Sequence, residues 1–330
     1  MKDCAAQSRG CATQDSPLAA DPRRQTVRPI ANFQGDIHMP SLTGLHRYVW
    51  AVCGRKPAKV YYTNGGIGDE LMLTAIAAAA RAAGRPLHLI ATYPDLWRGN
   101  SDPASLHTGV ERWHYASLRR WIATEVVHLS YETIAPLHIA EQMAAHTGVA
   151  LPAAWRPMFH SPIVATRDPR VIVVQNSCSG ARYSYSTKEW PQERWRELVR
   201  RLAGEFRVVQ LGTPSDPHLD GAEDLRGRTT LRDAARLLSG AAVFIGLESG
   251  LQHLAAGVRT PSVIIYGGRS YPHQTGYPFN LNLTRAPACA GCGLSSNCPH
   301  SMVCMDIPVT EVEAAARRLL ETAVERRPVA

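Results

Sequence analysis

The chain of 330 residues lacks a hydrophobic run long enough to span a bilayer. Its most apolar helical stretch, residues 71–83, is short and contains Arg81. The amino terminus begins with Lys2, Asp3 and Cys4 and has no apolar segment of the kind found in a secretory signal. Eight cysteines are too few for a disulfide scaffold in a chain of this length. Together these absences predict a cytoplasmic protein with reduced thiols.

Acidic residues are in deficit, because 28 Asp and Glu face 36 Lys and Arg, which leaves a formal net charge of +8. This excess favours anionic partners, namely phosphorylated small molecules, an anionic lipid surface or nucleic acid. The basic residues are scattered and no nucleic-acid motif is present, so nucleic acid is not expected. A peripheral contact with the inner membrane stays open.

The length suits two domains of ordinary size. Residues 1–40 show no hydrophobic periodicity and are predicted to be a disordered leader. We expect a first α/β domain over 41–165 and a second over 166–330. A Pro-rich stretch, residues 151–169, carries the expected junction.

A glycine-rich turn follows the first predicted strand, residues 58–63, and precedes a helix predicted over 71–83. The turn partly matches a dinucleotide-binding fingerprint. However, the third glycine position holds Leu71, and the next strand ends on Thr92 without an acidic residue for a ribose hydroxyl. An NAD(P)-dependent oxidoreductase is therefore a weak alternative.

Asp69 lies in this glycine-lined turn, at the carboxyl edge of the predicted sheet. An aspartate at this position could be an N-terminal helix cap. It could equally be a general base that points into a cleft.

A strand-turn-helix-strand unit lies in the second half of the chain. Residues 242–247 and 262–266 read as buried strands, with the polar turn 248–250 and a helix between them. Such a turn exposes backbone amides at the positive end of a helix, which suits a phosphate, although an ordinary βαβ crossover has the same spacing. Lys188 is expected at the same sheet edge, either as a phosphate contact or as a solvated cation.

Four cysteines within sixteen positions, Cys289, Cys292, Cys298 and Cys304, have the spacing of a tetrathiolate metal site. Zinc and iron both accept four thiolates, and a closed site of this kind would be structural; simple free thiols are the alternative. The surrounding segment 268–307 is predicted to be a long loop that a metal would order. A capping box at Thr310 is predicted to open the C-terminal helix. A non-catalytic, metal-dependent interaction protein is thus an alternative of another class.

Several motifs follow one another in a characteristic order. They are Gly68-Asp69 with Leu71 and Thr74, Lys188-x-Trp190-Pro191, Asp224 to Leu231, Glu248-Ser-Gly-x-x-His253-Leu-Ala-Ala256, and Pro261-x-Val-x-x-x-Gly267. Over residues 58–325 this series resembles glycosyltransferase family nine, whose best-known members are the lipopolysaccharide heptosyltransferases. The cysteine pattern that closes on Met305 is similar to the tail of many members, and an iron-binding version occurs in relatives that heptosylate autotransporters.

The resemblance implies a GT-B fold, in which two Rossmann-like parallel-sheet domains face each other across a cleft. It also implies inverting transfer, without a catalytic metal, of a heptose or related sugar from a nucleotide-diphosphate donor. The acceptor would be a hydroxyl of a glycan, a lipid-linked glycan or a protein, as in lipopolysaccharide or capsule biosynthesis. By position, Asp69 matches the general base, and the donor-binding residues are Lys188, Glu248, Ser249, Gly250 and His253. Glu248 departs from the aspartate that is usual in the family.

Overall fold

The computed structural model describes residues 59–109, 125–160 and 166–325. The predicted leader, residues 1–40, lies outside these ranges. The boundary at 165/166 adjoins the undescribed residues 161–165 and stays a prediction. Within the described ranges, helices and parallel strands alternate and form two sheets, which belong to the same compact unit of the chain.

The first sheet has the strand order β3-β2-β1-β4, with all neighbours parallel. Its strands are β1 (Lys59–Tyr62), β2 (His88–Ala91), β3 (Ser105–Thr108) and β4 (Glu125–His128). Helix α2 (Ile67–Ala82) connects β1 to β2, and the short helix η1 (Pro94–Trp97) follows β2. Helix α4 (Ile139–Ala145) packs beside α2.

The second sheet has the order β10-β9-β8-β5-β6-β7, again with all neighbours parallel. The strands are β5 (Asp168–Val174), β6 (Arg207–Gln210), β7 (Glu223–Asp224), β8 (Ala241–Leu247), β9 (Ser262–Tyr266) and β10 (Leu281–Thr284). The longer helices are α5 (Gln192–Leu202), α6 (Leu231–Gly240), α7 (Gly250–Gly257) and α9 (Val309–Glu325). Three short helices, η3 (Ser186–Lys188), α8 (Pro272–Thr275) and η4 (Val303–Met305), complete it.

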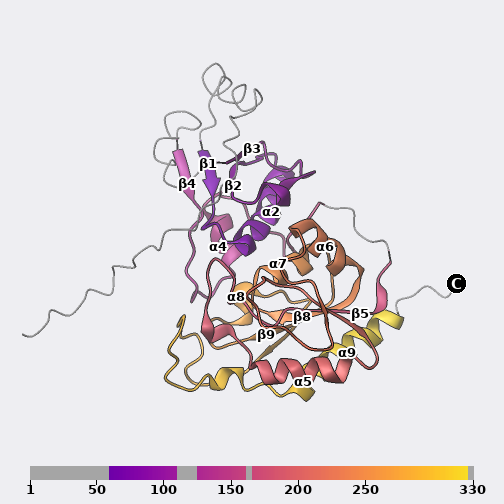
Figure 1. Cartoon of the computed structure of the whole chain (residues 1–330). Helices are drawn as coiled ribbons and strands as arrows, with labels where there is room; N and C mark the ends of the chain where they lie inside the picture. Colours follow the sequence, from indigo (N-terminus) through magenta and orange to yellow (C-terminus); the bar gives the residue numbers. More distant parts are fainter. Residues whose placement is uncertain (1–58, 110–124, 161–165, 326–330) are drawn as a thin grey trace, which may run out of the picture. The chain divides into compact units, whose positions relative to one another are not determined.

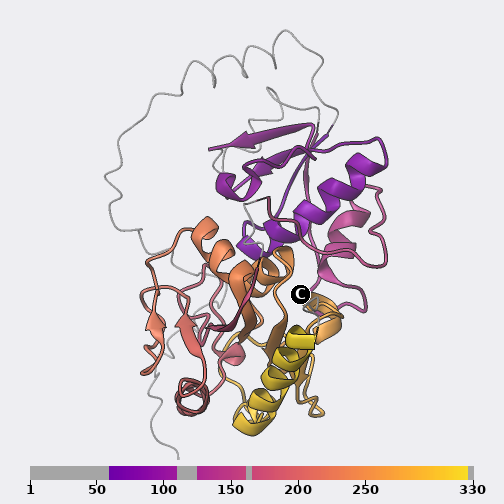
Figure 2. The same ribbon diagram turned by 90° about the vertical axis from the view of Figure 1, so that its right-hand side faces the viewer.

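Both faces of the second sheet are covered, as a parallel sheet requires. Ile172 and Val174 of β5 enter one hydrophobic cluster with α5 and α9, whereas Val171 and Val173 enter another with α6 and α7. Figure 1 shows α5 and α9 together on one face. Figure 2, turned by 90°, shows α6 on the opposite side of this sheet from α9. The residues of β8 and β9 are all buried for this reason.

Three details differ from the sequence expectation. Helix α2 begins at Ile67 and not at Leu71, because Gly66 adopts the extended N-cap conformation and Gly68 is tolerated in the first turn. The capping box predicted at Thr310 is wrong, since α9 already begins at Val309, directly after Pro308. The segment 268–307 is not one long loop, because it contains α8, β10 and η4. Among the described residues, no helix has the length and apolar character to cross a membrane.

Candidate functional site

The carboxyl ends of β1, β5 and β8 lead into loops that line one pocket of about 350 Å³. The pocket walls include all six residues that the sequence singled out for catalysis and donor binding: Asp69, Lys188, Glu248, Ser249, Gly250 and His253. They come from both sheets, so the fold brings together positions that are up to 184 residues apart in sequence (from 69 to 253). This edge is where ligands bind in open α/β sheets.

Glycines allow α2 and α7 to approach closely beside the pocket. A Cβ built on Gly68 would lie 2.7 Å from Cδ2 of His253, and one on Gly250 would overlap Cγ2 of Ile67. Neither position therefore accepts a larger residue without displacing the other helix. Because Asp69 directly follows Gly68, this packing sets the position of the carboxylate relative to α7.

Asp69 is the third residue of α2 and is buried. The N-cap of α2 is Gly66, and no side chain caps this helix end, so Asp69 is not an N-cap residue. Its Oδ1 accepts a hydrogen bond of 2.9 Å from the Tyr131 hydroxyl. Burial, and then the nearby Asp69 carboxylate, raise the pKa of Tyr131, so the phenol stays protonated and remains a donor. Tyr131 thus orients the carboxylate.

Lys188 and Glu248 form a largely buried ion pair, with Nζ 3.1 Å from Oε2. The carboxylate also accepts hydrogen bonds from Ser270 Oγ at 2.7 Å and from Thr275 Oγ1 at 2.9 Å. The ammonium also lies 5.2 Å from the ring centroid of Tyr185. Lys188 is therefore not the solvated cation of the alternative reading, and the longer side chain of Glu248 is held by specific partners.

His253 is buried beside Tyr277, whose hydroxyl lies 2.7 Å from Nδ1. Burial, followed by the charges of His138 and Lys188, lowers the pKa of His253 to about 3. The imidazole is therefore neutral near pH 7. It can offer a neutral hydrogen bond in the pocket but no positive charge to a phosphate.

The turn before α7 presents the start of that helix to the pocket. Ser249 is the N-cap residue, but its side chain does not cap the helix, and its Oγ donates to Oε1 of Gln175 instead. The first amides of α7, starting at Gly250, thus have no side-chain cap. Together with the helix dipole they form an environment suited to a phosphate oxygen.

Sequence reasoning did not select several other polar residues of this pocket, among them Tyr131, Arg182, Tyr185 and Arg269. Arg269 is buried, lies 4.0 Å from the Tyr185 ring centroid and donates to the carbonyl of Gly293. Arg182 donates to the carbonyl of Gly65 at 3.4 Å. The one available signal was position: Arg182 and Tyr185 follow β5, and Arg269 follows β9, at the carboxyl edge of the sheet.

Cys289, Cys292 and Cys298 lie between β10 and η4, in a segment whose Gly293 carbonyl accepts from Arg269, and Cys304 lies in η4. Cys304 is buried, Cys292 is exposed, and Cys289 and Cys298 are intermediate. Burial raises the pKa of Cys304, and the nearby Cys298 and Cys289 raise it further. These thiols are therefore close enough to influence each other. However, no group of three or more His, Cys, Asp or Glu side chains is arranged to hold a metal ion in the part of the chain that the structure describes.

Residues 165–293 match the family described as glycosyltransferase family 9 (heptosyltransferase). This segment is therefore similar to a glycosyltransferase family 9 domain. The chain is 31% identical over 109 residues to lipopolysaccharide heptosyltransferase 1 of Escherichia coli K12, a match that covers 30% of this chain and 34% of that protein. It is 32% identical over 137 residues to the autotransporter heptosyltransferase TibC of Escherichia coli H10407, covering 38% of this chain and 32% of TibC. The chain thus spans about a third of the length of these curated relatives.

The fold is also that of solved family 9 structures. The crystal structure of TibC, described as an iron-containing dodecameric glycosyltransferase, superposes with a TM-score of 0.64 at 19% identity. That superposition covers 81% of this chain and 77% of TibC. The predicted resemblance to family nine and the predicted GT-B fold, with two parallel-sheet α/β domains, are therefore confirmed.

Proposed function

We propose that this protein is an inverting glycosyltransferase that moves a heptose or related sugar from a nucleotide-diphosphate donor to a hydroxyl of a glycan, lipid-linked or protein acceptor. The observation that carries the proposal is the convergence of Asp69, the Lys188–Glu248 pair and the start of α7 on one pocket. The acceptor would contact the loops of the first sheet, and the donor those of the second. We place the reaction in the cytoplasm, where a peripheral membrane contact would suit a lipid-linked acceptor.

Asp69 is the proposed general base. Its carboxylate would take the proton of the acceptor hydroxyl while that oxygen bonds to the anomeric carbon from the face opposite the leaving group. The bond between the anomeric carbon and the diphosphate breaks, and its electron pair leaves with the diphosphate. The hydrogen bond from Tyr131 supports this role, because it holds the carboxylate in one orientation.

The donor diphosphate would lie against Lys188, the amides that begin at Gly250, and Arg269. Cations and backbone amides stabilise the negative charge that develops on a leaving diphosphate. The neutral His253 would donate a hydrogen bond to a donor oxygen. Glu248 would hold Lys188 in place. This chemistry calls for no catalytic metal.

We further propose that Cys289, Cys292, Cys298 and Cys304 hold a structural zinc or iron ion. Their spacing and the mutual influence of three of the thiols support this assignment. As the side chains stand, they do not form a ligand set, so binding would require the thiols to rotate towards a common point. We assign this metal no part in the transfer reaction.

Transfer assays with Asp69→Asn test the function. The amide keeps the shape of the carboxylate but cannot accept the proton, so turnover should fall by about a hundredfold or more. Affinity for the donor should change little, because Asp69 lies on the acceptor side. Donors to compare are ADP-heptose, which is bound in one solved TibC structure, and UDP- and GDP-sugars.

The matched control is Asp220→Asn, at an exposed aspartate outside the pocket, which should leave turnover unchanged. Tyr131→Phe should lower turnover less than Asp69→Asn does, since it removes only the orientation of the base. If Asp69→Asn kept near-normal turnover, or if no nucleotide-sugar raised the melting temperature, the proposed function would be wrong.

A further inference from the structure

A second pocket, of about 580 Å³, lies at the other end of α2 and shares no lining residue with the first. It is formed by α2, by the irregular segment 152–160 and by the end of α7. Asp69 and Ala82 are thirteen residues apart on α2, which corresponds to about 20 Å along the helix axis. The volume of this second pocket falls in the range of small-molecule sites.

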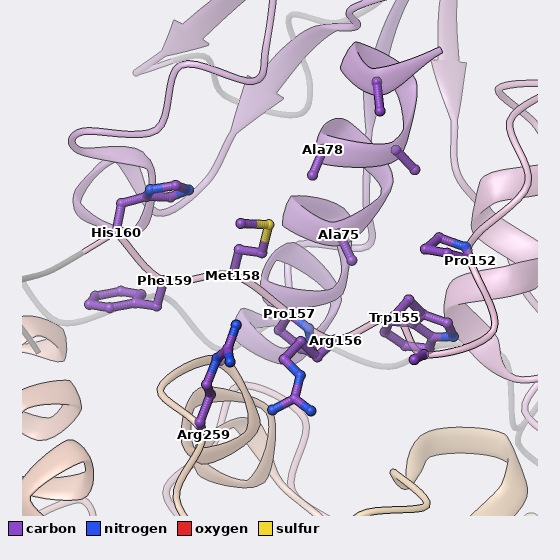
Figure 3. Close-up of a pocket in the computed structure, with 14 residues that line it drawn as sticks. Ala75, Ala78, Pro152, Trp155, Arg156, Pro157, Met158, Phe159, His160 and Arg259 are labelled. Carbon is purple, nitrogen blue, oxygen red and sulfur yellow. The ribbon is translucent and has the colours of Figure 1, made fainter.

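One wall of this second pocket is a stripe of small apolar residues on α2. Ala75, Ala78, Ala79 and Ala82 recur at the spacing of one helix face. Opposite them lie larger apolar side chains, among them Trp155 and Met158 (Figure 3). A hydrogen bond of 2.8 Å from the Met158 amide to Thr74 Oγ1 ties the segment 152–160 to α2. The body of the pocket is thus apolar, as a methylene chain requires.

Two guanidinium groups lie at one end of this apolar body, those of Arg156 and Arg259 (Figure 3). No carboxylate of the described residues forms an ion pair with either of them. Burial and the positive charge of Arg259 both lower the pKa of Arg156, which places the two cations within reach of each other. Like charges this close repel each other, and an anion between them would remove the repulsion.

Two further observations concern polar residues that line this pocket. Nε2 of His160, a lining residue, is shielded from solvent and has no hydrogen-bond partner among the described residues. Arg259 follows the end of α7 with a φ of 62°, a conformation in which glycine is normally favoured.

We propose that this second pocket binds an anionic amphiphile, with its alkyl chain along the alanine stripe of α2 and its phosphate or carboxylate between Arg156 and Arg259. The alkyl chain of the ligand contributes apolar contact, and the planar guanidinium groups contribute bidentate hydrogen bonds to the anion. The ligand is either a free amphiphile or a lipid of an anionic membrane. The site does not depend on the proposed transfer reaction, and its test reads neither transfer nor donor binding.

The test is calorimetric titration of the full-length protein with octyl phosphate below its micelle concentration. Octyl phosphate should bind at least about tenfold more tightly than octyl glucoside, which has the chain without the charge, and than inorganic phosphate, which has the charge without the chain. Equal affinity for octyl phosphate and octyl glucoside would overturn the proposal, as would the absence of binding.

Two variants locate the site. The double variant Arg156→Gln/Arg259→Gln should reduce the affinity for octyl phosphate to that for octyl glucoside. Ala78→Leu should weaken both octyl ligands by filling the stripe, and leucine is well tolerated in a helix. The matched controls are Arg200→Gln, at an exposed arginine of α5, and Ala83→Leu, at the exposed end of α2; both should bind as the unchanged protein does. Binding that survives the double variant, or that Arg200→Gln weakens equally, would contradict the assignment.

Vesicles distinguish the two sources of ligand. Co-sedimentation with phosphatidylglycerol vesicles but not with phosphatidylcholine vesicles, lost in the double variant, would identify a membrane lipid. Tight binding of octyl phosphate without vesicle binding would identify a free amphiphile. Both outcomes support the site.

Discussion

The buried pair of Lys188 and Glu248 makes a quantitative prediction for the variant Lys188→Met. The two side chains are only 15% and 7% exposed, and their charged atoms lie 3.1 Å apart. Removing the ammonium leaves the largely buried carboxylate without its countercharge, which typically costs about 3–5 kcal/mol. The Ser270 and Thr275 hydroxyls still donate to Glu248 and hold the cost near the lower limit, at about 3 kcal/mol.

Thermal unfolding measures this cost. A loss of about 3 kcal/mol corresponds to a melting temperature lower by about 6–12 °C for a domain of this size. Adding Glu248→Gln removes the buried charge while keeping an oxygen for the two hydroxyls, so the double variant should recover most of the loss. Lys59→Met is the matched control, because Lys59 pairs with Glu125 at 3.5 Å with both side chains about half exposed. Such a pair contributes less than about 1 kcal/mol.

Donor binding should not recover with stability. The ammonium that contacts the diphosphate is absent from both variants, so each should bind a nucleotide-diphosphate donor about 1.5–3 kcal/mol more weakly. This loss is roughly 10- to 150-fold in Kd, and the free nucleoside should be little affected. Two results would refute the reasoning: recovery of donor affinity in the double variant, or an unchanged melting temperature in Lys188→Met.

Three further predictions concern neighbouring features. Gly68→Ala should lower turnover and stability together, because the added Cβ would meet the ring of His253. Kinetics and thermal unfolding of one preparation check this prediction, and unchanged values would contradict it. Burial lowers the pKa of His138 to about 4, whereas the unfolded chain titrates near 6.5, so stability should fall as pH falls from about 6.5 towards 4. His138→Asn keeps a good N-cap residue and should reduce the slope of unfolding free energy against pH by about 1.4 kcal/mol per pH unit, measured by unfolding titrations. An unaltered slope would show that His138 is not the cause. Cys298→Ser should lower both the metal content, measured by elemental analysis, and the melting temperature, whereas Cys178→Ser, outside the cluster, should leave the metal content unchanged. Less than about a tenth of an equivalent of metal in the unchanged protein would exclude the site.

Much of the fold follows from local patterns in the sequence. The continuous apolar runs of β8 and β9 predict buried parallel strands, and the structure buries both at every position. The glycine turn before α2 and the turn before α7 each follow a strand, so both were expected at the carboxyl edge of a sheet. That expectation is enough to predict that Asp69 and Ser249 lie near a ligand site.

Other features depend on contacts that no local pattern reports. Tyr131 lies in the loop after β4 and reaches Asp69 only because β4 pairs with β1. β10 has just four half-buried residues at the edge of its sheet, which is too short a signal to separate from a loop. The alanine stripe of α2 reads as ordinary helix, and only the folded segment 152–160 encloses it as a pocket.

The cysteine loop acts on the donor pocket through backbone contacts. Arg269 donates to the carbonyl of Gly293, and Thr187, next to Lys188, donates to the carbonyl of Leu294 at 2.6 Å. The backbone between Cys292 and Cys298 thus holds Arg269 directly and Lys188 through its neighbour Thr187. Loss of order in that loop would displace these cations without touching Asp69. It should therefore weaken donor binding while the pH dependence of turnover at saturating donor, which reports the base, stays the same.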